Sequence, residues 1–169
     1  MRDFKVIYRG RILKLIAKTV RLPNRHVMKL EVILHPGAAL IVPFLDKDRI
    51  IFLRQFRPVV NAYLFELPAG TIEGKESPLS CAKRELTEET GFSSDKFRLL
   101  GSVYPVPGYS TERIFIYRAT ELKKTQTAAE ADEVINIRIL NKHKAQKLFR
   151  DKKIVDAKSI CALALCGWL

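Results

Sequence analysis

A short helix with a clear start and a clear end is the feature that most restricts the fold of this chain. Ser77 followed by Pro78 is typical of a helix start, because a serine side chain caps free backbone N–H groups and proline fits the first turn. Gly91 is typical of a helix end, so a helix over about residues 78–90 is predicted. A stripe of apolar side chains at spacings of three and four predicts the face that docks on a sheet: Leu79, Ala82 and Leu86.

The same helix carries carboxylates that its own stability does not favour. Three lie within about a third of the helix circumference: Glu85, Glu88 and Glu89. Carboxylates four residues apart repel by roughly 0.2–0.5 kcal/mol, and acids near a helix C-terminus meet the unfavourable end of the helix dipole. The chain has only 18 acidic residues against 30 basic ones. This concentration of acids indicates a site for divalent cations and phosphates, with a solvated acidic face as the alternative.

Apolar runs on both sides of the helix predict strands. Residues 4–34 form two alternating runs around a turn at 22–25, which predicts an N-terminal β-hairpin. Runs at 38–45 and 49–56 predict a second hairpin, buried on both faces. Further runs follow at 64–67, 97–104, 113–117 and 134–140, and N-caps for two C-terminal helices are predicted at Asn141 and Asp156. The predicted class is therefore α/β, an α/β sandwich with a mixed central sheet.

Composition limits the partners and the compartment. With 169 residues, of which 47% are hydrophobic, the chain is long enough for one domain with a real core. Its net charge of +12 favours anionic partners, or is simply a solvated basic surface. The three cysteines have no CxxC spacing, which argues against disulfides and zinc. The longest apolar tail, residues 160–169, is too short to span a bilayer, so we expect a cytoplasmic protein without membrane contact.

The helix and the loop before it together resemble the Nudix box. That box is a glycine, five residues, a glutamate, seven residues, and then Arg-Glu-aliphatic-any-Glu-Glu-any-Gly-aliphatic. The matching residues here are Gly70, Glu76 and the run Arg84-Glu85-Leu86-Thr87-Glu88-Glu89-Thr90-Gly91-Phe92. Only Phe92, aromatic where an aliphatic residue is usual, stretches the pattern. The resemblance implies a Nudix-type α/β/α sandwich and metal-dependent hydrolysis of a pyrophosphate linkage.

The resemblance also implies roles for residues of the box. Four groups would hold the cation, Mg²⁺ or alternatively Mn²⁺: the side chains of Glu85, Glu89 and Glu88, and the carbonyl of Ala69. Arg84 would orient the glutamates by ion pairing, and Glu76 would pair with Arg84 or cap the loop. Gly70 would permit the turn that brings the backbone near the cation.

Outside the box, the chain resembles the ADP-ribose pyrophosphatase branch of the family. The similar stretches are Glu31-Val32 before 35–38, residues 54–57, residues 66–70 and Pro107-Gly108. This implies that Arg57 contacts the substrate and that Glu66 lines the same cleft; the alternatives are a surface ion pair and a buried hydrogen-bonding group. The branch usually has an arginine where Leu30 stands, which leaves Lys29 as a substitute for nucleotide contacts.

The same branch takes its catalytic base from a glutamate on a loop before the last strand. Here that loop contains the acidic cluster 130–133, in which Glu133 is the first candidate and Glu130 the second. A plain solvated loop is the alternative. The implied reaction is attack on phosphorus by a water that the cation and this base activate, giving AMP and ribose 5-phosphate from ADP-ribose.

Several alternatives stay open at the level of sequence. Another nucleoside diphosphate sugar, such as GDP-mannose or UDP-glucose, would meet the same box, and the charge of +12 leaves removal of pyrophosphate from RNA 5′ ends as a further option. A non-catalytic nucleotide-binding module would not need three repelling glutamates. By analogy with the branch, residues 1–36 form an N-terminal β extension that joins two chains into a homodimer, and residues 37–169 form the catalytic domain.

Overall fold

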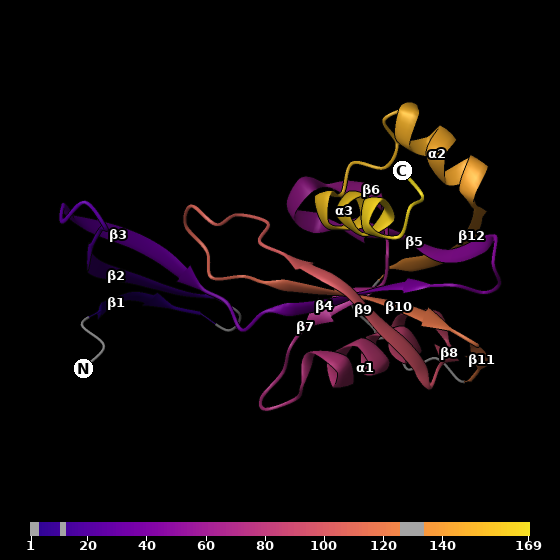
Figure 1. The fold of residues 1–169 in the computed structure, drawn as a ribbon, viewed down its shortest axis with the longest axis horizontal. Coiled ribbons are helices and arrows are strands. Elements are labelled where there is room, and N and C mark those ends of the chain that lie inside the picture. Colours follow the sequence, from indigo (N-terminus) through magenta and orange to yellow (C-terminus); the bar gives the residue numbers. More distant parts are fainter. Residues whose placement is uncertain (1–3, 11–12, 126–133) are drawn as a thin grey trace.

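The computed structural model of the chain, which describes residues 4–10, 13–125 and 134–169, has three layers of secondary structure, and a mixed sheet is the central one. The central sheet has the strand order β7 (Ala69–Thr71), β4 (Ala38–Pro43), β10 (Ile114–Thr120) and β9 (Lys96–Val103). Strand β10 runs parallel to β4, and the other pairs are antiparallel. Helix α1 (Pro78–Thr90) covers one face of this sheet (Figure 1).

The other face of the central sheet is covered by a second sheet and two helices. The second sheet is antiparallel, with the order β12 (Ile135–Asn141), β5 (Arg49–Arg57) and β6 (Ala62–Glu66). Helices α2 (Lys142–Arg150) and α3 (Ala157–Leu165) lie on this side in Figure 1. The short elements are η1 (Pro58–Val60) and the strand pair β8 (Phe92–Ser93) with β11 (Lys123–Lys124). The predicted α/β sandwich with a mixed sheet is confirmed.

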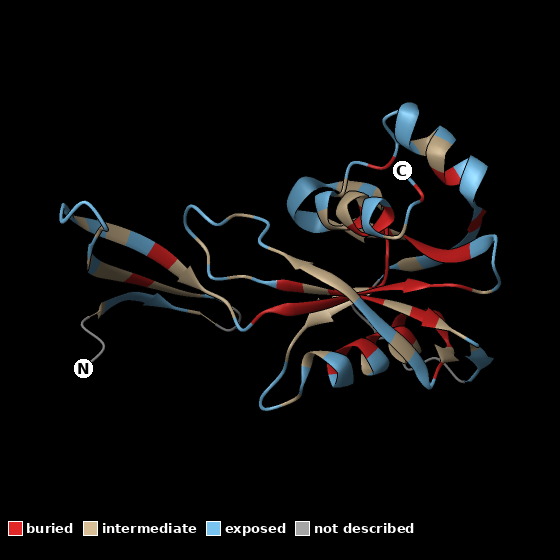
Figure 2. Cartoon of the chain, in the orientation of Figure 1, coloured by how far each residue is buried: buried red, intermediate tan, exposed pale blue. Residues whose placement is uncertain are grey.

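Strand β4 explains why the core has two halves. All six of its residues are buried, as Figure 2 shows for the centre of the molecule. Ala39 and Ile41 face α1, where they pack with Cys81, Ala82 and Leu86. Leu40 and Val42 face the opposite layer, which includes Phe52, Leu67, Leu163 and Trp168. A fully buried aliphatic side chain contributes roughly 1.5–3 kcal/mol, so this strand fixes both layers to the sheet.

The second predicted hairpin is wrong in its pairing, although both of its strands exist. Strands β4 and β5 belong to different sheets, and only an isolated bridge between Phe44 and Ile50 joins them. The turn between them is held by Asp46, whose carboxylate accepts hydrogen bonds from the backbone N–H groups of Asp48 and Arg49. A strand that is apolar on both faces shows no preference for one neighbour, so the sequence pattern did not reveal this pairing.

Three strands rather than two form the N-terminal extension. Strands β1 (Phe4–Arg9), β2 (Lys14–Arg21) and β3 (Val27–Leu34) make an antiparallel sheet in that order. The predicted hairpin corresponds to β2 and β3, and β1 is an addition that pairs with β2. This sheet projects away from the two core layers (Figure 1). The boundary predicted after residue 36 stays a prediction.

The helix caps are confirmed, whereas the apolar stripe of α1 needs a correction. The Ser77 side chain accepts from the Ser80 N–H, and Gly91 ends the helix with a φ of 69°. Asn141 and Asp156 cap α2 and α3 as predicted. Leu79, however, is 39% exposed, and the residues of the helix that pack against the sheet are Cys81, Ala82 and Leu86. Among the described residues, no helix is both long and apolar enough to cross a membrane.

Candidate active site

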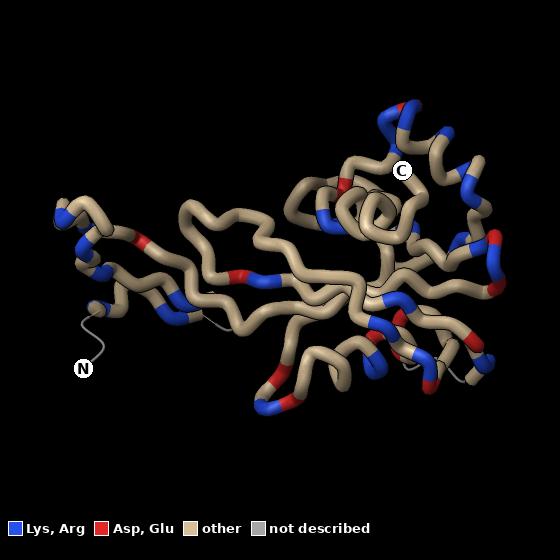
Figure 3. The backbone as a smooth tube through the Cα atoms, in the orientation of Figure 1, with Lys and Arg blue, Asp and Glu red and all other residues tan. Residues whose placement is uncertain are grey.

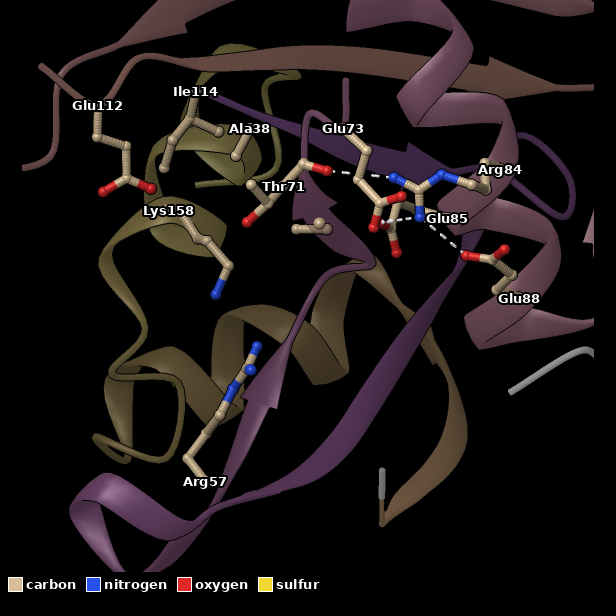
Figure 4. Close-up of a pocket in the computed structure, with 12 residues that line it drawn as sticks. Ala38, Arg57, Thr71, Glu73, Arg84, Glu85, Glu88, Glu112, Ile114 and Lys158 are labelled. Atoms are coloured by element: carbon tan, nitrogen blue, oxygen red, sulfur yellow. Dashed lines mark hydrogen bonds and ion pairs between the residues drawn. The ribbon is translucent and has the colours of Figure 1, made fainter. Parts of the chain in front are cut away.

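A cavity of about 500 Å³ opens where α1, β7 and the start of α3 approach one another. One side of it is formed by glutamates of α1 and the preceding loop, which we name the carboxylate wall: Glu73, Glu85 and Glu88. Another side is formed by two basic residues, which we name the cationic wall: Arg57 and Lys158. Figure 4 shows these side chains converging on one space from β5, α1 and α3. The size is that of an ordinary small-molecule site.

The carboxylates of α1 lie directly against the backbone of β7. Glu85 and Glu89 are both buried, and the Glu89 Oε2 accepts a hydrogen bond of 2.9 Å from the Ala69 N–H. A Cβ at position 70 would lie 1.7 Å from Glu85 Oε1, so only glycine leaves room for this carboxylate. Gly70 is not among the residues with positive φ. Its predicted role in a turn is therefore wrong, and the reason for glycine is the close approach of Glu85.

Arg84 holds the carboxylates in place. Its Nη1 lies 2.7 Å from Glu85 Oε1 and 3.0 Å from Glu88 Oε2, and its Nη2 lies 2.8 Å from Glu76 Oε1. The hydrogen bond from Arg84 is the main reason that the pKa of Glu76 lies below its usual value. The ion pairs expected for Arg84 are thus present. They bring Glu76, Glu85 and Glu88 together around one guanidinium, although Glu85 and Glu88 would otherwise repel.

The cationic wall rests on a buried glutamate. Glu66, at the end of β6, is 1% exposed, and its carboxylate receives two hydrogen bonds of 2.7 Å from Nε and Nη2 of Arg57. Lys158 Nζ also contacts Glu66 and lies 3.0 Å from Asp156 Oδ1. Burial alone would raise the pKa of Glu66, but the bonds from Arg57 and the charge of Lys158 lower it below its usual value. Glu66 is therefore ionised and carries two cations.

The sequence did not predict Lys158 as a site residue. Its partner Glu66 lies 92 positions earlier in the chain, so no local spacing connects the two residues. One signal was available: a lysine two residues after the predicted N-cap Asp156 places a cation at the positive end of a helix dipole. Such a cation needs an acidic partner or a ligand, and the structure supplies Glu66.

The loop between β9 and β10 brings Glu112 to the same cavity. This loop is tied to β3, because the Ile33 N–H donates to the Tyr109 carbonyl and the Thr111 N–H donates to the Ile33 carbonyl. Figure 1 shows the loop reaching toward the N-terminal sheet. Glu112 is accordingly held where the central sheet, the N-terminal sheet and the cavity meet. It is a further candidate for the catalytic base.

Glu66 and Glu89 do not line the cavity themselves, but each bonds to a residue that does, whereas the structure does not bring the three other predicted residues to it. Lys29 lies on β3, opposite Thr19 of β2, beside a shallow depression of the N-terminal sheet. Within one chain it does not join the other site residues. Glu130 and Glu133 lie outside the described residues, so their role as base stays a prediction.

The carboxylate wall and the β7 backbone beside it offer the kinds of oxygen ligand that a divalent cation binds. Carboxylate and backbone carbonyl oxygens are the donors that such cations take, and the glycine at position 70 keeps Glu85 close to the backbone of β7. In the part of the chain that the structure describes, no group of three acidic, histidine or cysteine side chains is arranged so that it could hold a metal ion. Arg84 bonds to one oxygen of Glu85 and one oxygen of Glu88, so it holds the two carboxylates beside each other.

The profile of the NUDIX domain matches residues 34–163. The chain belongs to the Nudix family. It is 34% identical over 159 residues to the methanol dehydrogenase activator of Bacillus methanolicus and 33% identical over 159 residues to the ADP-ribose pyrophosphatase of Bacillus subtilis (strain 168). Each match covers 93% of this chain and 86% of the relative. The predicted resemblance to the ADP-ribose pyrophosphatase branch is therefore confirmed, as is the prediction of a Nudix hydrolase.

The fold of this Nudix chain is shared with a solved structure. A crystal structure described as an ADP compounds hydrolase superposes with a TM-score of 0.84, covering 98% of this chain and 90% of the other. The two sequences are 23% identical, so this likeness concerns the fold alone. It confirms the predicted Nudix-type sandwich. Because the match covers 98% of this chain, it includes the N-terminal sheet. The roles of single residues stay predictions.

Proposed function

We propose that this chain hydrolyses the pyrophosphate bond of a nucleoside diphosphate sugar, with ADP-ribose as the first candidate and AMP and ribose 5-phosphate as products. The observation that carries this proposal is the cavity itself, in which a carboxylate wall and a cationic wall face one space. A diphosphate needs cations on several of its oxygens, and such a cavity offers them from two sides. The similarity to an ADP-ribose pyrophosphatase supports the choice of substrate.

Hydrolases of this family generally depend on divalent metal ions, and here Glu85, Glu88, Glu89 and the Ala69 carbonyl would hold the ion. Mg²⁺ is our first choice and Mn²⁺ the second. When bound, the ion offsets negative charge on the phosphate oxygens and makes water more acidic. Arg84 keeps the glutamates together in its absence, because it pairs with Glu85 and Glu88 while Glu76 holds its other end.

Arg57 would bind the substrate from the opposite wall. Two of its nitrogens are fixed by Glu66, which sets the plane of the guanidinium and directs its remaining part toward the cavity (Figure 4). A rigid guanidinium suits planar or bidentate recognition of phosphate oxygens. Glu66 would then act through Arg57, because it is nearly fully buried behind it.

The catalytic base has three candidates. Glu133 and Glu130 remain the first and second from the sequence, and Glu112 joins them because it lines the cavity. Each should be changed to Gln and assayed across pH at saturating Mg²⁺. Loss of the base should lower kcat by roughly 10² to 10⁴ and flatten the acidic limb of the pH profile, while the other two changes are nearly silent. Full kcat in all three variants would exclude every one of these assignments.

The decisive test of the function is a substrate panel with product analysis. The purified chain should be assayed with ADP-ribose, GDP-mannose, UDP-glucose and 5′-triphosphorylated RNA, each with Mg²⁺ and with EDTA. We expect AMP and ribose 5-phosphate from ADP-ribose, the highest kcat/KM for that substrate, and no turnover with EDTA. Cleavage of RNA ends alone, or nucleotide binding without turnover, would contradict the proposal.

The distribution of basic residues does not favour RNA as the substrate. Figure 3 shows Lys and Arg spread over the N-terminal sheet and α2 rather than gathered in one groove that could bind an RNA strand.

The homodimer is part of the same proposal. Strand β1 is an edge strand, and three of its apolar side chains are exposed: Val6, Ile7 and Tyr8. An exposed apolar edge strand needs cover, and a second copy of this sheet would supply it. A dimer would also give Lys29 a route to the cavity of the other chain. Light scattering coupled to size exclusion should give twice the mass of 19.3 kDa, and a monomer at micromolar concentration would exclude it. A cytoplasmic location stays a prediction.

A further inference from the structure

Lys158 occupies a helix position that is unfavourable for a cation. It is the second residue of α3, where a cation meets the positive end of the helix dipole, and its side chain is only 19% exposed. A mostly buried lysine side chain also loses hydration and rotamer freedom. Its acidic partners Glu66 and Asp156 offset these costs, but they do not explain why the lysine lines the cavity.

The need of Glu66 for a partner does not by itself account for Lys158. Glu66 already receives a bidentate pair of hydrogen bonds from Arg57, the strongest arrangement available to a carboxylate. One guanidinium neutralises one carboxylate. Asp156, the other partner of Lys158, also caps α3, because its Oδ2 accepts from the Ser159 N–H at 3.0 Å and the Ser159 hydroxyl at 2.6 Å. Lys158 therefore balances Asp156 as well as Glu66, and the cluster holds two cations and two carboxylates.

The orientation of this cluster points to a ligand. Of its four charged members, the two cations Arg57 and Lys158 line the cavity, while the carboxylates of Glu66 and Asp156 lie behind them. In Figure 4 the Lys158 ammonium and the Arg57 guanidinium approach each other, because both bond to the carboxylate of Glu66. The two cations are thereby held side by side at the lining of the cavity, where an anionic ligand would meet both of them.

We propose that Lys158 is a substrate-binding residue that, together with Arg57, holds the diphosphate of the ligand on the side opposite the carboxylate wall. This proposal rests on the function proposed above and adds a residue from the C-terminal helix to the site. Lys158 supplies a compact charge that can follow a phosphate oxygen, whereas Arg57, fixed by Glu66, supplies a rigid one. Together they would neutralise the diphosphate oxygens that the carboxylate wall and its cation leave unpaired.

The test compares three variants of the full chain: Lys158→Met, Lys158→Arg and the control Lys147→Met. Methionine keeps most of the lysine stem without its charge, and arginine keeps the charge. Lys147 pairs with Asp151 on the exposed face of α2, so its loss repeats a broken ion pair away from the cavity. Binding of inorganic pyrophosphate is measured by calorimetry with and without Mg²⁺, KM and kcat are measured with the nucleotide sugar, and melting temperature reports on folding.

We expect Lys158→Met to weaken pyrophosphate binding and raise KM by roughly tenfold or more, as loss of a charged hydrogen bond implies, with a smaller change in kcat. Lys158→Arg should restore both values to within about threefold, and Lys147→Met should match the wild type. If Lys158 only supports Glu66, Lys158→Met will melt earlier while binding and KM stay unchanged, and the proposal is overturned.

The same experiment separates this proposal from the proposed function. Wild-type protein that binds pyrophosphate through Lys158 but hydrolyses no nucleotide sugar would contradict the function and keep the role of Lys158. Hydrolysis with unaltered KM in Lys158→Met would keep the function and remove Lys158 from the site. Wild-type protein that does not bind pyrophosphate even with Mg²⁺ would also overturn the role of Lys158.

Discussion

The two charged walls of the cavity are built from the same kinds of residue, but they expose them differently. In the carboxylate wall, the arginine lies among the acids: the Arg84 side chain is 27% exposed, against 32% for Glu88 and 10% for Glu85, and all three line the cavity. In the cationic wall, the acid is hidden: the Glu66 side chain is 2% exposed, against 38% for Arg57. The cationic wall therefore presents its cations alone to the cavity, whereas the carboxylate wall presents acids that an arginine already pairs.

The comparison also shows how each wall is held before any ligand arrives. Arg84 gathers residues from one helix and the loop before it, so the carboxylate wall is local in sequence. Glu66 joins Arg57 of β5 to Lys158 of α3, so the cationic wall depends on the packing of three separate elements. Damage to the first wall should affect chemistry more than folding, and damage to the second should affect binding and folding together.

The largest effect is expected from Glu89→Gln at the carboxylate side. The glutamine is isosteric and its carbonyl can still accept from the Ala69 N–H, but the charge for the cation is lost. We expect kcat to fall by at least roughly 10²-fold. The free energy of unfolding should stay within about 0.5 kcal/mol, because repulsion with Glu85 is relieved. Steady-state kinetics and urea unfolding measure the two quantities. Near-normal turnover, or an unfolded variant, would make these carboxylates structural.

A smaller but informative effect is expected from Gly70→Ala. The added methyl would collide with the Glu85 carboxylate, which is the flexible end of a side chain and can move aside. Stability should therefore fall by only about 1–2 kcal/mol, whereas activity should fall by roughly 10- to 100-fold because the carboxylate is displaced. The matched control is Gly108→Ala, where nothing lies within 4 Å of the new Cβ. Equal activity in both variants would show that the position of Glu85 is not critical.

On the cationic side, Arg57→Ala should raise KM roughly tenfold and lower kcat less, because Arg57 holds the ligand before and during the reaction. Glu66 would keep Lys158 as a partner, so the free energy of unfolding should drop by about 1–2 kcal/mol. Arg57→Lys should not restore KM, since lysine cannot repeat the bidentate contact with Glu66. An unchanged KM for Arg57→Ala would remove the cationic wall from substrate binding.

The two walls differ in how far the sequence could predict them. The bounds and caps of α1 followed from signals a few residues apart, and the pairs of Arg84 were implied by the resemblance to the Nudix box. The position of Lys158 did not follow, since its contact with Glu66 exists only once α3 packs beside β6. The pairing of β4 was predicted wrongly, because a strand that is buried on both faces carries no pattern that identifies its neighbours. Leu79 was predicted wrongly because the buried face of the helix includes Cys81 and the polar residues Glu85 and Glu89, which an apolar pattern does not reveal.

The smallest effect on turnover is expected from Glu66→Gln, which tests the cationic wall through pH. The pKa of Glu66 in the folded protein lies below its ordinary value of 4.5, because the hydrogen bonds from Arg57 and the charge of Lys158 outweigh burial. A carboxyl group with a lowered folded pKa stabilises the protein above its unfolded pKa, and that contribution is lost as pH falls through the folded pKa. Wild-type stability from this group should thus be complete at pH 7 and decline below about pH 4.5.

The Gln variant lacks this ionisation, so the difference between the two proteins isolates Glu66. At pH 7 the variant should be less stable by roughly 1–3 kcal/mol, because Arg57 and Lys158 lose a buried charged acceptor. The gap should narrow below pH 4.5 with a slope of at most about 1.4 kcal/mol per pH unit, the value for one proton. Urea unfolding of both proteins from pH 7 to pH 3 measures it, and the other carboxyl groups cancel in the difference. A gap that stays constant over this range would mean that Glu66 does not titrate with a lowered pKa, and the two cations would then not be anchored by its charge.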